Sequence, residues 1–150
     1  MRDPDLRRLL REELLNLEQA LPSFERSLAK CASLSPSPRQ SFEDEESFDA
    51  LTSKFARISD IFTQKVLKTF VALLREDAPT FIDRMNLCEK LGVIPSAAQM
   101  IAVRDLRNTI AHEYATDDLM EVYRDTVALS PRLIEAISSA RERANAALSS

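Results

Sequence analysis

The stretch RDLRNTIAHEY, residues 104–114, contains the only histidine of the chain, five residues after Arg107 and two before Tyr114. An imidazole can accept or donate a proton near neutral pH, and an arginine can bind a phosphate through two parallel hydrogen bonds. These groups suit metal-free cleavage of an RNA phosphodiester, in which one histidine takes the 2′-hydroxyl proton, another protonates the leaving 5′-oxygen, and arginine stabilises the phosphoryl charge. A polar helix end is the other interpretation, because the helix dipole also favours cations there.

The spacing of these residues leaves both interpretations open. On an ideal helix Arg107 and His112 point about 140° apart, because each residue turns about 100°. Asn108 lies one turn before His112, so its amide can orient the imidazole. Arg107 can approach the imidazole if its long side chain wraps towards the helix end, or if a two-fold axis brings an Arg107 and a His112 from each subunit into one cleft.

The remaining residue types argue against a metal site. Cys31 and Cys88 lack CxxC or Cys/His spacing, and they are too few for a disulfide framework. With a single histidine, a zinc site would need an improbable set of ligands. We therefore expect two buried or boundary cysteines, and neither a metal nor a cofactor.

The charge weakens a nucleic-acid interpretation without excluding it. The net charge is −4, whereas nonspecific nucleic-acid binding depends mainly on Lys and Arg. Fifteen of the 20 basic residues are arginine, however, and a local basic cleft can exist on an acidic protein.

The hydropathy pattern predicts a cytoplasmic protein. No apolar run approaches the roughly 18 residues of a membrane span. The first residues, MRDPDLRRLLREELL, are charged throughout, unlike the apolar core of a signal peptide. We expect no membrane contact.

The elements that must position these residues are predicted to be helices. One glycine and seven prolines in 150 residues leave little room for hairpins, and this length is typical of one domain, residues 1–150. A first helix is expected over 4–32, with Pro22 kinking or breaking it. Residues 33–47, rich in Ser, Pro and acids, are predicted to be a mobile connection.

A second helix, over residues 48–73, has the clearest period. Apolar side chains recur at steps of three and four and predict a buried stripe: Phe48, Leu51, Phe55, Ile58, Phe62, Val66, Phe70 and Leu73. The polar side is expected to be solvated and consists of Ser53, Arg57, Asp60, Gln64 and Lys68.

Three further helices complete the prediction. A short one begins near Pro79 and stops near Gly92, and another runs from Pro95 into the motif. The buried side of the latter is expected to hold Ala98, Ile101, Ala102, Leu106 and Ile110. The last begins with Thr116 as its cap, and Pro131 should bend or restart it. Four long helices and one short one, joined by short turns, predict an all-α, up-and-down bundle.

The string RNTIAHEY also fits the pattern RxxxxHxY. In an all-helical chain of this length it resembles the HEPN superfamily, specifically the HepT-like toxins encoded beside MNT nucleotidyltransferases. Arg107, Asn108, His112 and Tyr114 match the motif residues, and the resemblance covers about residues 44–145. It implies a HEPN-like fold for the bundle.

The resemblance further implies a homodimeric, metal-independent endoribonuclease that acts as the toxin of a toxin–antitoxin pair. Arg107 and His112 would be catalytic at a composite dimer cleft, with Asn108 orienting the histidine. The cognate MNT nucleotidyltransferase, the antitoxin, would inactivate the toxin by transferring AMP to Tyr114. The implied partners are RNA, that transferase and a second copy of the chain.

Two alternatives stay open. The superfamily also contains noncatalytic partners, or nucleotide- or substrate-binding subunits, of nucleotidyltransferases, and the acidic composition is compatible with such a role. The weaker alternative is a structural bundle without a ligand, in which the motif is only a polar helix end.

Overall fold

The computed structural model describes residues 3–112 and 116–150, and all regular structure within these ranges is helical. In chain order the elements are α1 (Asp3–Ala32), α2 (Phe42–Asp60), the π-helix η1 (Ile61–Val66), α3 (Leu67–Leu73), α4 (Phe81–Lys90), α5 (Ala97–Ala111) and α6 (Thr116–Ser149). The elements α2, η1 and α3 follow one another without a break and form one long rod. The described chain therefore contains the predicted four long helices and one short helix.

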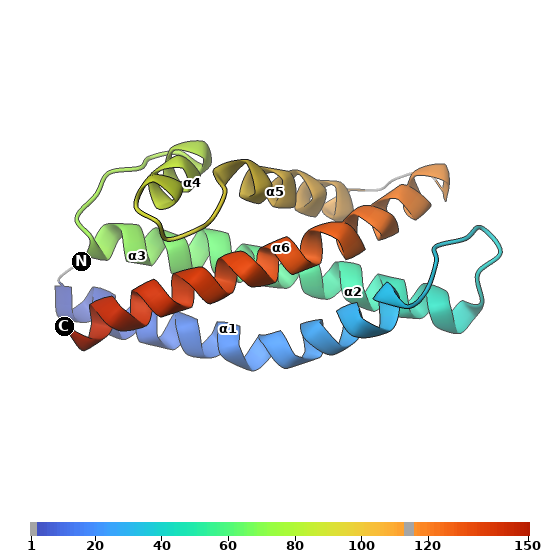
Figure 1. Cartoon of the computed structure of the whole chain (residues 1–150), viewed down its shortest axis with the longest axis horizontal. Helices are drawn as coiled ribbons and strands as arrows, with labels where there is room; N and C mark the ends of the chain where they lie inside the picture. The colour runs from blue at the N-terminus through green and yellow to red at the C-terminus, as the bar shows by residue number, and fades with distance from the viewer. Residues whose placement is uncertain (1–2, 113–115) are drawn as a thin grey trace.

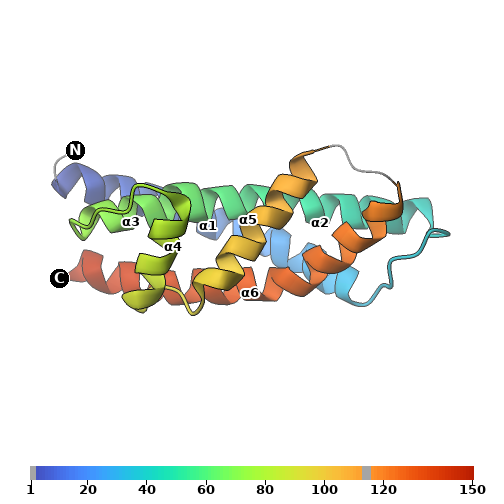
Figure 2. The ribbon, with the colours of Figure 1, turned by 90° about the horizontal axis from the view of Figure 1, so that it is seen from above.

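The helices form an up-and-down bundle. Both termini lie at the same end, with α1 and α6 extending along the long rod (Figure 1). The shorter helices α4 and α5 lie on one side of these three, and α5 crosses them obliquely (Figure 2). This arrangement places the end of α5, which carries the motif, away from the termini.

The long rod supplies much of the core, as its period predicted. All eight residues of the apolar stripe are buried: Phe48, Leu51, Phe55, Ile58, Phe62, Val66, Phe70 and Leu73. Phe24 of α1 packs edge-on against Phe55, and Tyr123 of α6 stacks on Phe48 with ring centres 4.8 Å apart. Burying such a stripe against neighbouring helices is the main source of helix stability in a protein.

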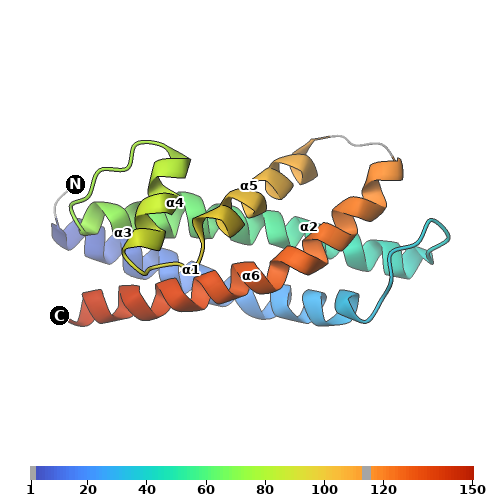
Figure 3. The ribbon, with the colours of Figure 1, turned by 45° about the horizontal axis from the view of Figure 1, so that its top comes forward.

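Neither Pro22 nor Pro131 ends its helix, so the expected break and restart do not occur. Pro22 and Pro131 lie inside helices that continue through them. Each proline is exposed while its neighbours Leu21 and Ser130 are buried, so packing holds both sides together and the freed carbonyl can face water. Figure 3 shows α6 curving along its length without restarting.

The predicted connection over 33–47 is also too long, because α2 already begins at Phe42. The Ser41 side chain accepts a hydrogen bond from the Asp44 backbone N–H, and three acids occupy the first turn. A serine cap and acids near a helix N-terminus both stabilise that end. The acidic composition of 43–47 is therefore a helix start.

The predicted stop at Gly92 is confirmed. The backbone of Gly92 has φ +72°, a conformation that glycine adopts readily after a helix end. The Val93 N–H donates to the Cys88 carbonyl at 2.8 Å, which closes the turn. A side chain at this position would also approach the Arg143 guanidinium to 3.1 Å.

The fourth predicted helix exists, but its buried face is displaced. It begins at Ala97, where the Ser96 side chain caps the Gln99 N–H. Its buried residues are Ala97, Met100, Val103 and Leu106. Ala98 is exposed, contrary to prediction, and Ile101, Ala102 and Ile110 are half-buried. This register places the polar motif residues of α5 outside its buried face.

Candidate functional site

Arg107 is held at the end of α5 by a carboxylate from another helix. Its Nε and Nη2 atoms each donate to an oxygen of Asp60, at the end of α2, both at 2.8 Å. The hydrogen bond and then the charge of Asp60 raise the pKa of Arg107. The two side chains are 34% and 43% exposed, so the pair lies at the surface. The arginine is thereby fixed in a two-point geometry.

The Asp60 pair leaves part of the guanidinium for a second anion. A guanidinium has five N–H donors in a planar fork, and the bidentate pair uses two of them. The Nη1 side of the fork is therefore chemically suited to a phosphate oxygen. Asp60 nevertheless cancels one positive charge at this point of the surface.

His112 is placed differently from the helical expectation. The helix ends at Ala111, and His112 has an extended backbone, φ −98° and ψ 155°. Its N–H donates to the Thr109 carbonyl at 3.2 Å, and its side chain is exposed. An exposed imidazole just beyond a helix end is accessible to a substrate.

The expected hydrogen bond from Asn108 to His112 is not formed between the described side chains of one chain. That expectation required His112 to lie one turn further along the same helix, and the helix stops one residue too early. Asn108 is exposed on the last turns of α5. Arg107 faces Asp60 on α2, so the chain alone does not bring these motif residues into one cluster.

Tyr114, the predicted AMP acceptor, lies outside the described residues. The other tyrosine, Tyr123, is fully buried and its hydroxyl donates to the Asp49 carboxylate. A buried phenol of that kind is unsuited to modification by a separate enzyme. The assignment of Tyr114 as the AMP acceptor therefore depends on the RxxxxHxY motif.

Asp60 was missed by the sequence reasoning, which placed it on a solvated face. Its partner is 47 positions away, so no local spacing connects them. One signal was present: Asp60 is the only acid among the polar side chains named for that face, which otherwise hold Ser53, Arg57, Gln64 and Lys68. A lone acid on such a face marks a candidate ion-pair partner.

An acidic cavity lies between α5 and α6, next to the motif. Its volume is about 480 Å³, and an apolar floor that includes Leu106 and Val122 is surrounded by four acids: Asp105, Asp118, Glu121 and Asp125. Such a surface repels an RNA backbone. RNA approaching the motif would therefore have to contact the Arg107 side of α5.

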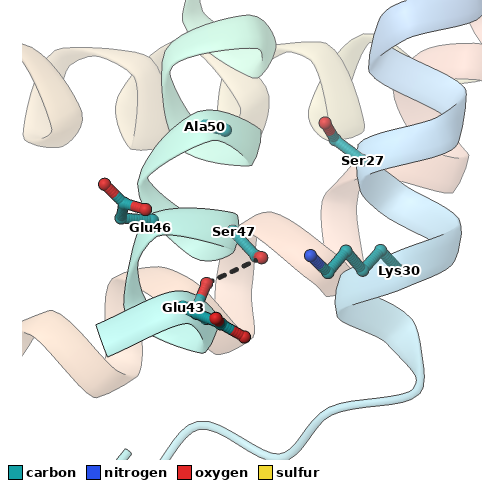
Figure 4. A pocket seen from close by; sticks show the side chains of 6 residues that line it. All are labelled: Ser27, Lys30, Glu43, Glu46, Ser47 and Ala50. Carbon is teal, nitrogen blue, oxygen red and sulfur yellow. Dashed lines mark hydrogen bonds between the residues drawn. The ribbon is translucent and has the colours of Figure 1, made fainter. Parts of the chain in front are cut away.

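A second cavity, of about 330 Å³, separates the end of α1 from the start of α2 (Figure 4). Its six lining residues are Ser27, Lys30, Glu43, Glu46, Ser47 and Ala50. The Ser47 hydroxyl donates to the Glu43 carbonyl at 2.9 Å. The lining mixes both signs of charge and includes no motif residue, so we do not assign it a function.

Two general properties of the described chain bear on the site. Among residues 3–112 and 116–150, no group of three or more His, Cys, Asp or Glu side chains is arranged to hold a metal ion. Within the same ranges, none of the helices combines the length and apolar character that crossing a bilayer requires. Cys31 and Cys88 are both buried and unpaired with each other, as predicted.

Comparisons of the chain with models of protein families, with curated proteins and with solved structures find no match.

Proposed function

We propose that the chain is the toxin of a toxin–antitoxin pair and acts as a metal-independent endoribonuclease of the HEPN type. The observation that supports this most is the end of α5, where Asp60 holds the Arg107 guanidinium in a two-point geometry and the exposed His112 follows the last helical residue. This end presents one cation fixed in two-point geometry and one accessible imidazole. The rest of the assignment depends on the RxxxxHxY resemblance.

The reaction would occur where two subunits bring their α5 ends together. One His112 imidazole takes the proton of a ribose 2′-hydroxyl, whose oxygen attacks the adjacent phosphorus. The bond to the 5′-oxygen breaks, and His112 of the second subunit supplies a proton to that leaving oxygen. Arg107 stabilises the added charge on the phosphoryl oxygens. The products are a 2′,3′-cyclic phosphate and a 5′-hydroxyl.

Asp60 and Asn108 would be positioning residues in this scheme. Asp60 fixes the Arg107 fork before RNA binds, which reduces the reorganisation needed in the transition state. Asn108 is exposed on the same end of α5. An orienting contact from Asn108 to an imidazole would have to cross the dimer interface, because it is not made within one chain.

The regulatory step would be AMP transfer from ATP to Tyr114 by a cognate MNT nucleotidyltransferase. The phenolic oxygen forms a bond to the α-phosphate, and pyrophosphate leaves. The resulting phosphodiester carries a negative charge two residues from His112, where it would compete with RNA phosphates for arginine. The adenosine group would also block access to the cleft.

The test is cleavage of total RNA and small structured RNAs in EDTA by purified protein shown by mass to lack an adduct. Wild type is expected to leave 2′,3′-cyclic phosphate ends. His112→Ala and Arg107→Ala should each abolish cleavage and toxicity without unfolding the exposed helix end. The control is Arg57→Ala, which removes an exposed arginine of α2 that does not belong to the motif. Full activity in both motif variants would refute the assignment.

Two observations favour a second function, that of a noncatalytic partner of a nucleotidyltransferase. The acids around the α5–α6 cavity and the neutralisation of Arg107 by Asp60 both reduce attraction for RNA. In that case expression would be harmless, and adduct-free protein would cleave no RNA while binding the transferase. Toxicity that is relieved by co-expression of a cognate nucleotidyltransferase would favour the ribonuclease.

A further inference from the structure

Arg84, on α4, is a buried cation without a carboxylate partner. Only 7% of the residue is exposed. Its Nη2 atom reaches the Gln64 amide oxygen at 3.5 Å, the outer limit of a hydrogen bond, and its Nε atom is buried without any partner. Within the described residues, Arg84 forms no ion pair. An arginine stays charged in proteins, so this arrangement leaves a positive charge poorly compensated.

The side chains around Arg84 do not supply the missing charge. Cys88, one turn further along α4, stays a neutral thiol because burial raises its pKa to about 11. The Phe81 ring lies 5.9 Å from the Arg84 guanidinium carbon and 4.3 Å from that of Arg104 on α5. Phe81 thus contacts two cations, and its ring only partly offsets their charge.

Arg84 lines a cavity of about 480 Å³ formed by the long rod, α4 and the segment that joins them. This volume lies within the range of small-molecule sites. Lys68 adds a second cation, while Val71 and Phe81 are among its apolar walls. Glu76 and Asp77 also line the cavity, and both are exposed. The buried part therefore presents the arginine, and the acids lie where water screens them.

From this geometry we propose that the cavity between the long rod and α4 binds the phosphate group of a small molecule through Arg84 and Lys68. The planar fork of an arginine matches two phosphate oxygens, and a lysine adds a point charge. The apolar wall at Phe81 offers a surface for an organic group attached to that phosphate. The site is independent of the proposed ribonuclease activity, because neither Arg84 nor Lys68 belongs to the motif.

A small ligand fits the burial better than an RNA strand does. Arg84 lies below the surface, where the continuous backbone of a polynucleotide has poor access, whereas a single phosphate can enter a cavity. Inorganic phosphate and a phosphate monoester share the recognising chemistry. They differ in whether the Phe81 wall is used.

The experiment is a titration of the full-length protein with inorganic phosphate and, separately, with AMP, against potassium chloride at equal ionic strength. Two signals are followed: the NMR resonance of the Arg84 Nε–H and the thermal unfolding midpoint. We expect phosphate to shift the Nε–H resonance and raise the midpoint beyond the chloride control. Tighter binding of AMP would identify a monoester as the ligand, and tighter binding of phosphate would identify the free anion.

Three variants test the assignment. Arg84→Gln should weaken phosphate binding by about tenfold or more, and Lys68→Gln by about two- to fivefold, because the lysine is exposed. Gln64→Glu should also weaken it, by giving Arg84 an internal carboxylate, and it serves if Arg84→Gln does not fold. Arg57→Gln, an exposed arginine that does not line the cavity, is the control and should bind as wild type does.

Two results would overturn the proposal. The first is a response to phosphate and AMP no larger than that to chloride, or one that Lys68→Gln and Gln64→Glu leave unchanged. The second is binding of an RNA oligonucleotide without terminal phosphates at Arg84 while inorganic phosphate does not bind. A negative result here leaves the ribonuclease proposal intact, because its test depends on Arg107 and His112.

Discussion

Two arginines contact the long rod at residues four positions apart, Asp60 and Gln64, and the two arginines differ in burial and in the quality of their partners. Arg107 of α5 lies near the surface and forms a bidentate ion pair with Asp60. Arg84 of α4 is buried and meets only the amide of Gln64, at 3.5 Å. The more exposed arginine therefore has the better partner, which is the reverse of what desolvation alone would require.

The difference separates positioning from stability. A surface ion pair contributes little free energy of folding, so the value of Asp60 lies in the direction it imposes on the Arg107 fork. A buried and poorly paired charge costs free energy, and an external anion that pairs with it would recover part of that cost. The Asp60 pair thus fixes the orientation of Arg107, whereas Arg84 lacks a counter-ion that an external anion could supply.

The largest expected effect concerns the direction of the Arg107 fork. Arg107→Lys keeps the charge but cannot bind Asp60 and a phosphate through one planar group. If the ribonuclease proposal holds, cleavage should fall about 100-fold, the usual cost of losing one transition-state donor. The measurement is the cleavage rate in EDTA, with Arg57→Lys as the matched control. Equal rates for the two variants would show that charge alone suffices at Arg107.

The second largest effect is expected from a substitution that gives the buried Arg84 a carboxylate partner, as Arg107 already has. Gln64→Glu places a carboxylate where Arg84 now has an amide, and the charged hydrogen bond should raise the free energy of unfolding by about 1.5 kcal/mol. Chemical denaturation at pH 7 measures it. The control is Ser53→Glu, which adds an acid on the exposed face of α2 away from both arginines. A loss of stability would mean that Arg84 is already satisfied.

A buried acid offers a test in which the substitution removes a charge instead of adding one. Glu13 is 7% exposed; its Oε1 atom accepts from the Thr69 hydroxyl at 2.6 Å, and its Oε2 atom has no partner. Burial raises the pKa of Glu13 above its ordinary 4.5. The folded chain then holds a proton that the unfolded chain releases, so this contribution is complete below about pH 4.5 and is lost as the pH rises through the raised pKa.

Glu13→Gln should therefore raise the free energy of unfolding at pH 7 by about 1 kcal/mol, since a neutral amide keeps the bond with Thr69 without the buried charge. The advantage over wild type should shrink as the pH falls towards 4.5. Denaturation curves between pH 4 and 8 measure it, with the exposed Glu12→Gln as control. A pH-independent difference would contradict this explanation.

The smallest expected effect is on the stability contributed by the exposed pair. Asp60→Asn should lower the free energy of unfolding by less than about 1 kcal/mol, because both side chains are well solvated. Thermal unfolding at low and high salt measures it, and the wild-type advantage should fall at high salt. A larger loss would mean that the Asp60 pair is a structural requirement of the fold.

The sequence predicts the bundle well where local pattern and burial agree. The stripe from Phe48 to Leu73 needs only the helical period, and the stop at Gly92 needs only the conformational freedom of that residue. The end of α5 is harder to predict, because no glycine or proline marks Ala111 and His112. The hydrogen bond expected within one chain from Asn108 to His112 is absent because α5 ends at Ala111.

The features that the sequence did not predict depend on contacts between residues distant in sequence. Asp60 and Arg107 are 47 positions apart, and no pattern within either helix connects them. The burial of Arg84 was not predicted either, since an arginine on a short helix is normally exposed. It is buried here because α4 packs against both the long rod and α5, an arrangement that depends on the whole bundle.

The π-helix η1 sets the rotational phase of the long rod. Between Phe62 and Leu67 the backbone hydrogen bond spans five residues, so this turn contains one residue more than an α-turn. Winding the same residues as an ordinary α-turn, with none removed, would rotate everything after it by about 100° relative to α2. Lys68 and the buried Phe70 would then exchange surroundings with their neighbours, although no residue upstream of the turn had changed. The spatial relation between the two arginine regions thus depends on one inserted residue.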